Sequence, residues 1–139
     1  MNKLKISQVQ FNASHIPNLN SKILEKNFKR AIKFKPDLIC TPECSNIITK
    51  DKKYLQLNAP YQNQCPVLKM AKNFAKKNKV NINLGSLLLK IKNKSKLVNR
   101  SFFIDDNGAI KKTYDKIHMF DVKINNSEVH KESASFIAG

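Results

Sequence analysis

Residues 36–43 read Pro-Asp-Leu-Ile-Cys-Thr-Pro-Glu, and this stretch constrains how the elements on either side of it can be arranged. Pro36 predicts the end of a helix, because the residue before a proline disfavours helical geometry. The apolar residues 38–40 then predict a short buried strand, and Pro42 stops it because proline has no N–H for a strand ladder. Glu43 is therefore expected just beyond the carboxyl end of a strand.

Two amphipathic helices are predicted, one on each side of this strand in the chain. Between Ser21 and Phe34 the apolar side chains recur at helical spacing, and lysines occupy the opposite side. Pro66 predicts the first turn of the second helix, whose apolar positions continue with the same period to Ala75. The polar stretch 51–64 before the second helix is expected to be a loop.

The other apolar segments predict strands at residues 1–11, 80–89, 97–104 and 109–114. Asn107 and Gly108 lie between the last two segments and are typical of a tight hairpin turn. The order strand, helix, strand, helix, strand, hairpin predicts an α/β fold with both helices on one face of a sheet. No segment is left for the opposite face, so we expect that face and a sheet edge to be exposed for a partner or for more chain.

Length and composition indicate one globular domain. The 139 residues suffice for a single hydrophobic core, and 41% of them are hydrophobic. No run approaches the roughly 20 apolar residues needed to cross a bilayer, and the first residues do not form a continuous signal core. Cys40, Cys44 and Cys65 lack the spacing of zinc ligands, so we expect reduced thiols, no metal and a cytoplasmic location.

The formal net charge of +16 supports a second interpretation, a noncatalytic lysine-rich module that binds nucleic acid or an anionic membrane. Only Arg30 and Arg100 are arginines, whereas base recognition and bidentate phosphate contacts favour arginine. The lysines are also spread along the whole chain. We therefore expect neither nucleic acid nor a membrane as the partner, and we keep the binding module as the alternative to an enzyme.

Three charged residues are the candidates for chemistry: Glu43 and Lys116, each after a predicted strand, and Glu132 in the C-terminal tail. Loops at strand ends commonly hold reactive groups on a rigid scaffold. Taken singly, however, Glu43 and Lys116 are better explained as solvated surface charges. Their spacing alone does not decide between the two interpretations.

Residues 37–43 resemble the strand and Pro-Glu site of the nitrilase superfamily of carbon-nitrogen hydrolases, and residues 114–121, Tyr-Asp-Lys-Ile-His-Met-Phe-Asp, resemble its lysine motif. The first strand, the hairpin from Asn99 to Gly108 and the stretch from Glu132 to Gly139 resemble the same family in the same order. The chain looks nearest to the branch with omega-amidase and deaminated glutathione amidase. The resemblance implies an α-β-β-α sandwich, incomplete at the C-terminus, in which residues 1–139 are the N-terminal part of a single domain.

The resemblance also implies a Glu-Lys-Cys site that acts on a small carboxamide substrate without a cofactor. Buried Glu43 would be the general base that takes the thiol proton and later protonates the leaving ammonia. Lys116 would stabilise the oxyanion in a water-poor pocket, and Glu132 would orient the lysine and the substrate. His118 would brace the site by a local hydrogen bond, and the complete protein would be a homodimer.

The nucleophilic cysteine of the family lies beyond the tail motif, so this chain is expected to end before reaching it. Cys40, Cys44 and Cys65 do not match the nucleophile position, and we expect structural roles for them. The 139-residue chain by itself is therefore expected to be inactive. A degenerate paralogue that serves as a partner subunit is the third interpretation.

Overall fold

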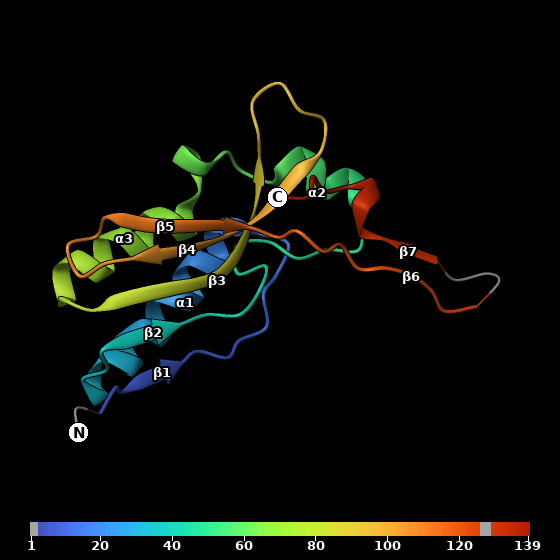
Figure 1. Cartoon of the computed structure of the whole chain (residues 1–139). Helices are drawn as coiled ribbons and strands as arrows, with labels where there is room; N and C mark the ends of the chain where they lie inside the picture. Colours follow the sequence, from blue (N-terminus) through green and yellow to red (C-terminus); the bar gives the residue numbers. More distant parts are fainter. Residues whose placement is uncertain (1–2, 126–128) are drawn as a thin grey trace.

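A five-stranded sheet forms the centre of the computed structural model, which describes residues 3–125 and 129–139 (Figure 1). In spatial order its strands are β1 (Ile6–Gln8), β2 (Leu38–Cys40), β3 (Asn81–Lys90), β4 (Leu97–Ile104) and β5 (Ile110–Asp115). The first three strands run parallel, whereas β4 is antiparallel to both β3 and β5. The predicted α/β class is confirmed, and β1 and β5 are the edges of this sheet.

Two helices, α1 (Pro17–Ala31) and α3 (Pro66–Asn78), cover one face of the sheet, as predicted (Figure 1). Each helix begins with a proline, whose fixed φ suits a first turn that needs no N–H partner. α3 ends at Asn78, and its C-cap Lys79 adopts the left-handed conformation with a φ of 52°. The apolar faces of the helices form one core with the sheet, and the rings of Phe28 and Phe74 meet edge to face with centroids 5.3 Å apart.

The opposite, helix-free face of the sheet carries the alternate residues of the same strands. Ile6 and Leu38 are paired neighbours on this face, and Phe103 and Tyr114 lie on it further along the sheet. Ile6 and Tyr114 are 48% and 56% exposed, because α1 and α3 both lie on the other side. The chain thus contains one helix layer and one sheet layer, which are two of the four layers expected for an α-β-β-α sandwich.

The polar stretch that was expected to be a loop contains the helix α2 (Lys52–Asn58) and the 3-10 helix η2 (Gln62–Gln64), so that prediction is wrong. α2 has seven residues, and Leu55 is the one among them that is buried. A single buried apolar residue gives no helical period that could be recognised in the sequence. The local signal was Asp51, whose side chain accepts the Tyr54 N–H at 2.9 Å as the N-cap of the helix.

Several bounds also differ from those predicted. β1 is shorter than the predicted strand at residues 1–11, and α1 begins at Pro17 rather than at Ser21. The last predicted turn of that helix is the 3-10 helix η1 (Ile32–Phe34). No helix within the described ranges is both long and apolar enough to cross a membrane.

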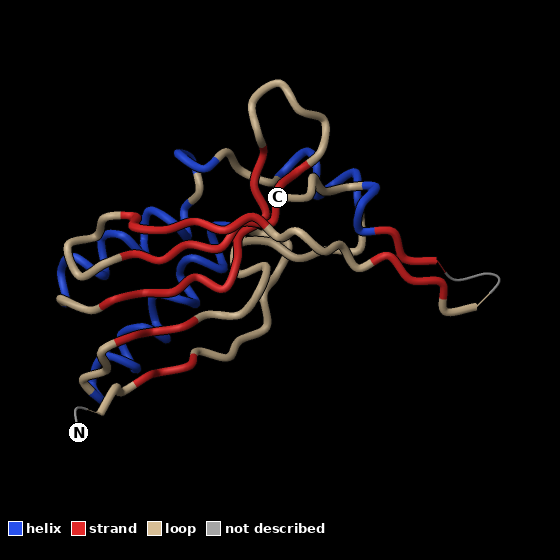
Figure 2. Tube along the Cα trace, in the orientation of Figure 1, coloured by secondary structure: helices blue, strands red, loops and turns tan. Residues whose placement is uncertain are grey.

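The C-terminal tail, to which the sequence analysis assigned no element, forms an arm and then returns to the sheet. The arm consists of the antiparallel strands β6 (Asp121–Lys123) and β7 (Val129–Lys131), and the 3-10 helix η3 (Glu132–Ala134) follows it. Figure 2 shows the arm projecting from the body of the molecule. Beyond η3, the Ile137 N–H donates to the Leu97 carbonyl at 2.8 Å, which ties the tail to the start of β4.

Candidate active site

Glu43 belongs to a loop that is fastened to β3. The Cys44 N–H donates to the Ser86 hydroxyl at 2.9 Å. The fully buried Asn46 side chain forms two hydrogen bonds of 2.8 Å with the backbone of Leu88, one as donor and one as acceptor. Asn46 thereby pairs with β3 as the backbone of a neighbouring strand would. The main chain that follows Glu43 is held firmly, so the position of the glutamate is determined by β3.

Gly85 permits the close approach of β3 to the strand end that leads to Glu43. A β-carbon on Gly85 would lie 2.3 Å from the Thr41 carbonyl oxygen, closer than any real side chain allows. The register of β3 against β4 shifts between Leu84 and Leu87, so Gly85 lies within an irregularity of the strand. Any larger residue at this position would push the Glu43 loop away from the sheet.

Lys116 follows β5 directly and is anchored through its main chain. Its N–H donates to the Asn99 carbonyl at 2.9 Å, which extends the pairing of β4 and β5 by one residue. Its own carbonyl accepts the Gly139 N–H at 3.0 Å from the returning tail. The lysine side chain therefore projects from a fixed strand end rather than from a mobile loop.

Glu132 is the first residue of η3, and its carboxylate is held by the start of the arm. Glu132 Oε2 accepts the Phe120 N–H at 2.6 Å, and the Glu132 N–H donates to the Phe120 carbonyl at 3.3 Å. The hydroxyl and the N–H of Ser133 both donate to Asp121, and these hydrogen bonds lower the pKa of that carboxyl. The 3-10 turn that carries Glu132 is thus bound to the chain just after Lys116.

The structure brings the three candidate residues together. Lys116 Nζ lies 3.2 Å from Glu43 Oε1 and 3.0 Å from Glu132 Oε1. Partial burial opposes the charge of the ammonium, but hydrogen bonds to Glu132 and Glu43, together with their charges, hold the pKa of Lys116 above its ordinary value. The Lys116 ammonium is therefore charged at neutral pH and lies between the side-chain oxygens of Glu43 and Glu132.

This site cluster, Glu43 with Lys116 and Glu132, is less buried than the resemblance implied. The side chains of Lys116 and Glu132 are 31% and 17% exposed, whereas that of Glu43 is 57% exposed. The expected burial of Glu43 is wrong for this chain, because only one helix layer and one sheet layer surround the cluster. His118 is also exposed and forms no hydrogen bond within the described part of the chain, so the expected bracing is not seen.

Asn99 adjoins the cluster, although its position in the sequence indicates no role of its own. Its Nδ2 donates to Glu43 Oε1 at 2.6 Å, and the residue is 2% exposed. Within residues 3–125 and 129–139, Asn99 Oδ1 is buried without a hydrogen-bond partner. The available signal was its place in the hairpin stretch that leads to Lys116, but one polar residue within a strand is not a specific pattern for function.

Cys44 is the cysteine that adjoins the cluster, and its chemistry argues against a nucleophilic role. Burial, followed by the charge of Glu43, raises the pKa of the Cys44 thiol to about 12. Such a thiol is almost entirely protonated at neutral pH and reacts poorly. All three cysteines are free, and burial raises the pKa of Cys40 and of Cys65 as well. In the described ranges no three metal-ligating side chains gather that could hold an ion.

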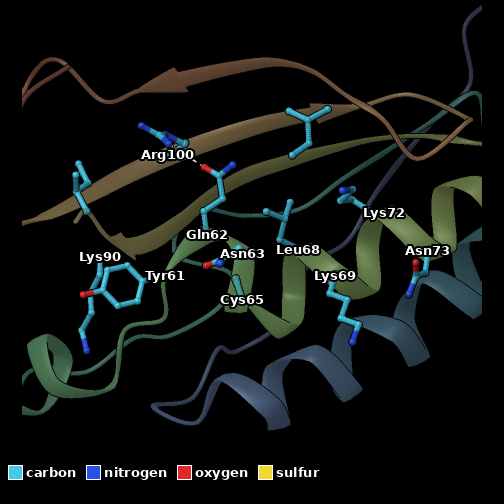
Figure 3. A pocket seen from close by; sticks show the side chains of 12 residues that line it. Tyr61, Gln62, Asn63, Cys65, Leu68, Lys69, Lys72, Asn73, Lys90 and Arg100 are labelled. Carbon is cyan, nitrogen blue, oxygen red and sulfur yellow. Dashed lines mark hydrogen bonds between the residues drawn. The ribbon is translucent and has the colours of Figure 1, made fainter.

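A cavity of about 580 Å³ lies on the helix-covered side, between α3 and the sheet, and does not include the cluster (Figure 3). Its lining residue Arg100 donates to both carboxylate oxygens of Asp115 and to the side-chain oxygen of Gln62. Successive residues of a strand point to opposite faces, so Arg100 lines the cavity whereas its neighbour Asn99 reaches Glu43. Cavity and cluster are therefore separate features on the two faces of β4.

The family model described as carbon-nitrogen hydrolase matches residues 7–139, and the chain belongs to this family. It is 30% identical over 145 residues to the deaminated glutathione amidase of Dictyostelium discoideum, covering 100% of this chain and 50% of that protein. It is 28% identical over 114 residues to nitrilase homolog 2 of the same organism, covering 82% of this chain and 34% of that protein. The chain thus spans half of the first relative and about a third of the second.

Solved structures of the nitrilase superfamily share the fold. The NitFhit protein of C. elegans has a TM-score of 0.81 at 23% identity, covering 98% of this chain and 32% of that one. Nit3 of Saccharomyces cerevisiae has a TM-score of 0.78 at 20% identity, and the match covers 98% of this chain and 48% of Nit3. The amidase of Nesterenkonia sp. AN1 has a TM-score of 0.78 at 15% identity, and the match covers 99% of this chain and 50% of that amidase. The predicted resemblance to the nitrilase superfamily is confirmed, as is the predicted fold.

Proposed function

We propose that residues 1–139 supply the acid-base part of a cysteine-dependent amidase that hydrolyses the carbon-nitrogen bond of a small carboxamide. The observation that carries this proposal is the position of Lys116 Nζ between Glu43 and Glu132. A fixed ammonium beside a carboxylate offers an oxyanion partner and a proton acceptor at one place. Membership of the carbon-nitrogen hydrolase family supports the class of reaction.

In the proposed reaction, the sulfur of a cysteine outside these residues attacks the amide carbon, and Glu43 takes the thiol proton. Lys116 stabilises the negative oxygen of the tetrahedral intermediate, and Glu132 keeps the ammonium in place. The carbon-nitrogen bond then breaks, and ammonia leaves with the proton held by Glu43. Glu43 next takes a proton from water, and the water oxygen attacks the thioester carbon. The carbon-sulfur bond then breaks, and Glu43 returns the proton to the sulfur, which gives a carboxylic acid and restores the thiol.

The choice of a carboxamide substrate is supported by the relatives. One relative, of which half is matched by the whole of this chain, is named a deaminated glutathione amidase. Two mutants of the Nesterenkonia amidase have been seen with a compound attached to the active-site cysteine, one with acrylamide and one with the acetamide moiety of fluoroacetamide. We propose a small carboxamide for the complete protein too, acting without a cofactor. We further propose a homodimer, as the family resemblance implies, in the cytoplasm, where its thiols would stay reduced.

The test is ammonia release from short carboxamides by a protein in which residues 1–139 are followed by the cysteine-bearing part of the domain. Reading the gene beyond the codon for Gly139 tests whether that part is encoded there. Glu43→Gln is expected to lower kcat/KM by about a hundredfold or more, with an unchanged circular dichroism spectrum. Lys116→Gln is expected to do likewise, and Lys26→Gln, at an exposed lysine of α1, is its matched control.

Activity that survives Glu43→Gln would overturn the role of general base. The 139-residue chain alone is expected to release no ammonia, because the proposal places the nucleophilic cysteine outside these residues. Ammonia release by the purified chain that is lost on Cys44→Ser would place the nucleophile within these residues instead.

A further inference from the structure

We infer that Asn99 is a positioning residue that anchors one oxygen of Glu43 and leaves the other oxygen to accept the proton. Glu43 Oε1 accepts two hydrogen bonds, from Asn99 Nδ2 at 2.6 Å and from Lys116 Nζ at 3.2 Å. Among the described residues, none donates to Glu43 Oε2. The catalytic meaning of this difference rests on the proposed function, whereas the anchoring itself does not.

Asn99 is suited to this task because it is rigid where Glu43 is not. Glu43 is 57% exposed, and an exposed glutamate side chain otherwise samples several rotamers. Asn99 is 2% exposed within β4, and its main-chain carbonyl accepts the Lys116 N–H at 2.9 Å. One buried residue therefore holds the side chain of the candidate base and the main chain of the candidate oxyanion partner.

Within the described residues, the hydrogen bond to Glu43 is the one that the Asn99 side chain makes, because its Oδ1 is buried without a partner. A buried acceptor without a donor destabilises a fold, and native proteins contain few of them. The amide cannot turn over to relieve this, because its oxygen would then face the oxygen of Glu43. A leucine has a similar branched shape and would leave no buried acceptor. The presence of an amide is explained by its hold on Glu43.

The thiol of Cys44 can report whether this hold exists. Its pKa responds to the charges of Glu43, Lys116 and Glu132, so its rate of alkylation changes when the Glu43 carboxylate moves. We would measure the alkylation of Cys44 by iodoacetamide in the 139-residue chain, at one alkaline pH, by mass spectrometry of the peptide that contains it. The same rate is measured in N99L, in E43Q and in the double variant, after circular dichroism has shown that each is folded.

The expected result is a strong dependence of one substitution on the other. N99L should change the rate by about threefold or more when Glu43 is present, and should have no effect in the E43Q background. Asn83→Leu is the matched control, since Asn83 lies on the helix-free face of the neighbouring strand and donates no hydrogen bond to Glu43. Cys44 should be alkylated in the Asn83→Leu variant at the same rate as in the wild type. The inference would be overturned if N99L changed the alkylation rate of Cys44 equally with Glu43 and with E43Q. It would also be overturned if N99L left the rate unchanged when Glu43 is present.

A second measurement needs no substitution of Asn99. In the wild-type chain, NMR should show the Asn99 side-chain amide proton that donates to Glu43 shifted downfield, and Glu43→Ala should remove this shift. An amide signal that Glu43→Ala leaves unchanged would also overturn the inference. Neither measurement requires turnover. Failure of the anchoring and failure of the proposed amidase reaction are thus observed separately.

Discussion

Lys116 Nζ lies 3.2 Å from Glu43 Oε1, although the two residues are 73 positions apart in the chain. The direction of the strands explains this proximity. β2 and β3 are parallel, and β5 runs in the direction of β3 because β4 is antiparallel to both. The carboxyl ends of β2 and β5 therefore lie at the same end of the sheet, where Glu43 and Lys116 follow them.

Lys116→Met is expected to lower the free energy of unfolding by about 1–2 kcal/mol. Glu132 is 17% exposed and would lose the cation that neutralises it, whereas the more exposed Glu43 would contribute little. Urea unfolding of the 139-residue chain measures the change. Lys112→Met, at an exposed position of β5, is the control and should stay within about 0.5 kcal/mol of the wild type. Equal losses in both variants would contradict this prediction.

The stabilisation by Lys116 is expected to disappear only in strong base. Although partial burial works against the charged form, hydrogen bonds to Glu132 and Glu43 raise the pKa of Lys116 above its ordinary value of 10.5. A group whose pKa is raised by folding contributes fully below its unfolded pKa and loses its contribution as the pH rises through the folded value. The difference in unfolding free energy between wild type and Lys116→Met should be constant from neutral pH to about pH 10 and then shrink. A difference that grows in base would be inconsistent with the raised pKa.

Cys44 is expected to resist alkylation in the folded chain. Burial and then the charge of Glu43 raise the pKa of its thiol from 9.0 to about 12, and each unit removes a factor of ten from the thiolate fraction. The native rate should therefore be about a thousandfold below that of the urea-unfolded chain at the same pH. Mass spectrometry of the peptide that contains Cys44 provides the measurement. A native rate close to the unfolded rate would mean that the thiol is neither buried nor near a negative charge.

Gly85→Ala is expected to destabilise the chain by about 1–3 kcal/mol and to disturb the site cluster. Its β-carbon would lie 2.3 Å from the Thr41 carbonyl oxygen, so β3 and the loop of Glu43 would have to separate. Chemical denaturation measures the loss, and the NMR signal of the Cys44 N–H, which donates to Ser86, reports the movement of the loop. Ser95→Ala in an exposed loop should change neither. An unperturbed Cys44 signal in Gly85→Ala would show that the close approach is not required.

The elements predicted with the correct bounds are those whose signals are local. β2 at Leu38–Cys40 is bounded by Pro42, and β4 at Leu97–Ile104 is bounded by the Asn107-Gly108 turn. α2, β6 and β7 were missed because their stability comes from an N-cap or from pairing with another segment rather than from an apolar period. β6 and β7 have three residues each, which is too few to show alternation, and they lack the apolar run and the proline that mark β2.

The amino-acid sequence by itself determined which segments are helices or strands in the core, and that Glu43 and Lys116 each follow a strand. The spacing of apolar residues and the positions of prolines are patterns over a few neighbouring residues, so they can be recognised in the sequence. Only the tertiary structure decided that these residues meet, that Glu43 is exposed, and that Asn99 binds its carboxylate. Those facts depend on strand direction and on distances between residues remote in the chain, which no local pattern records.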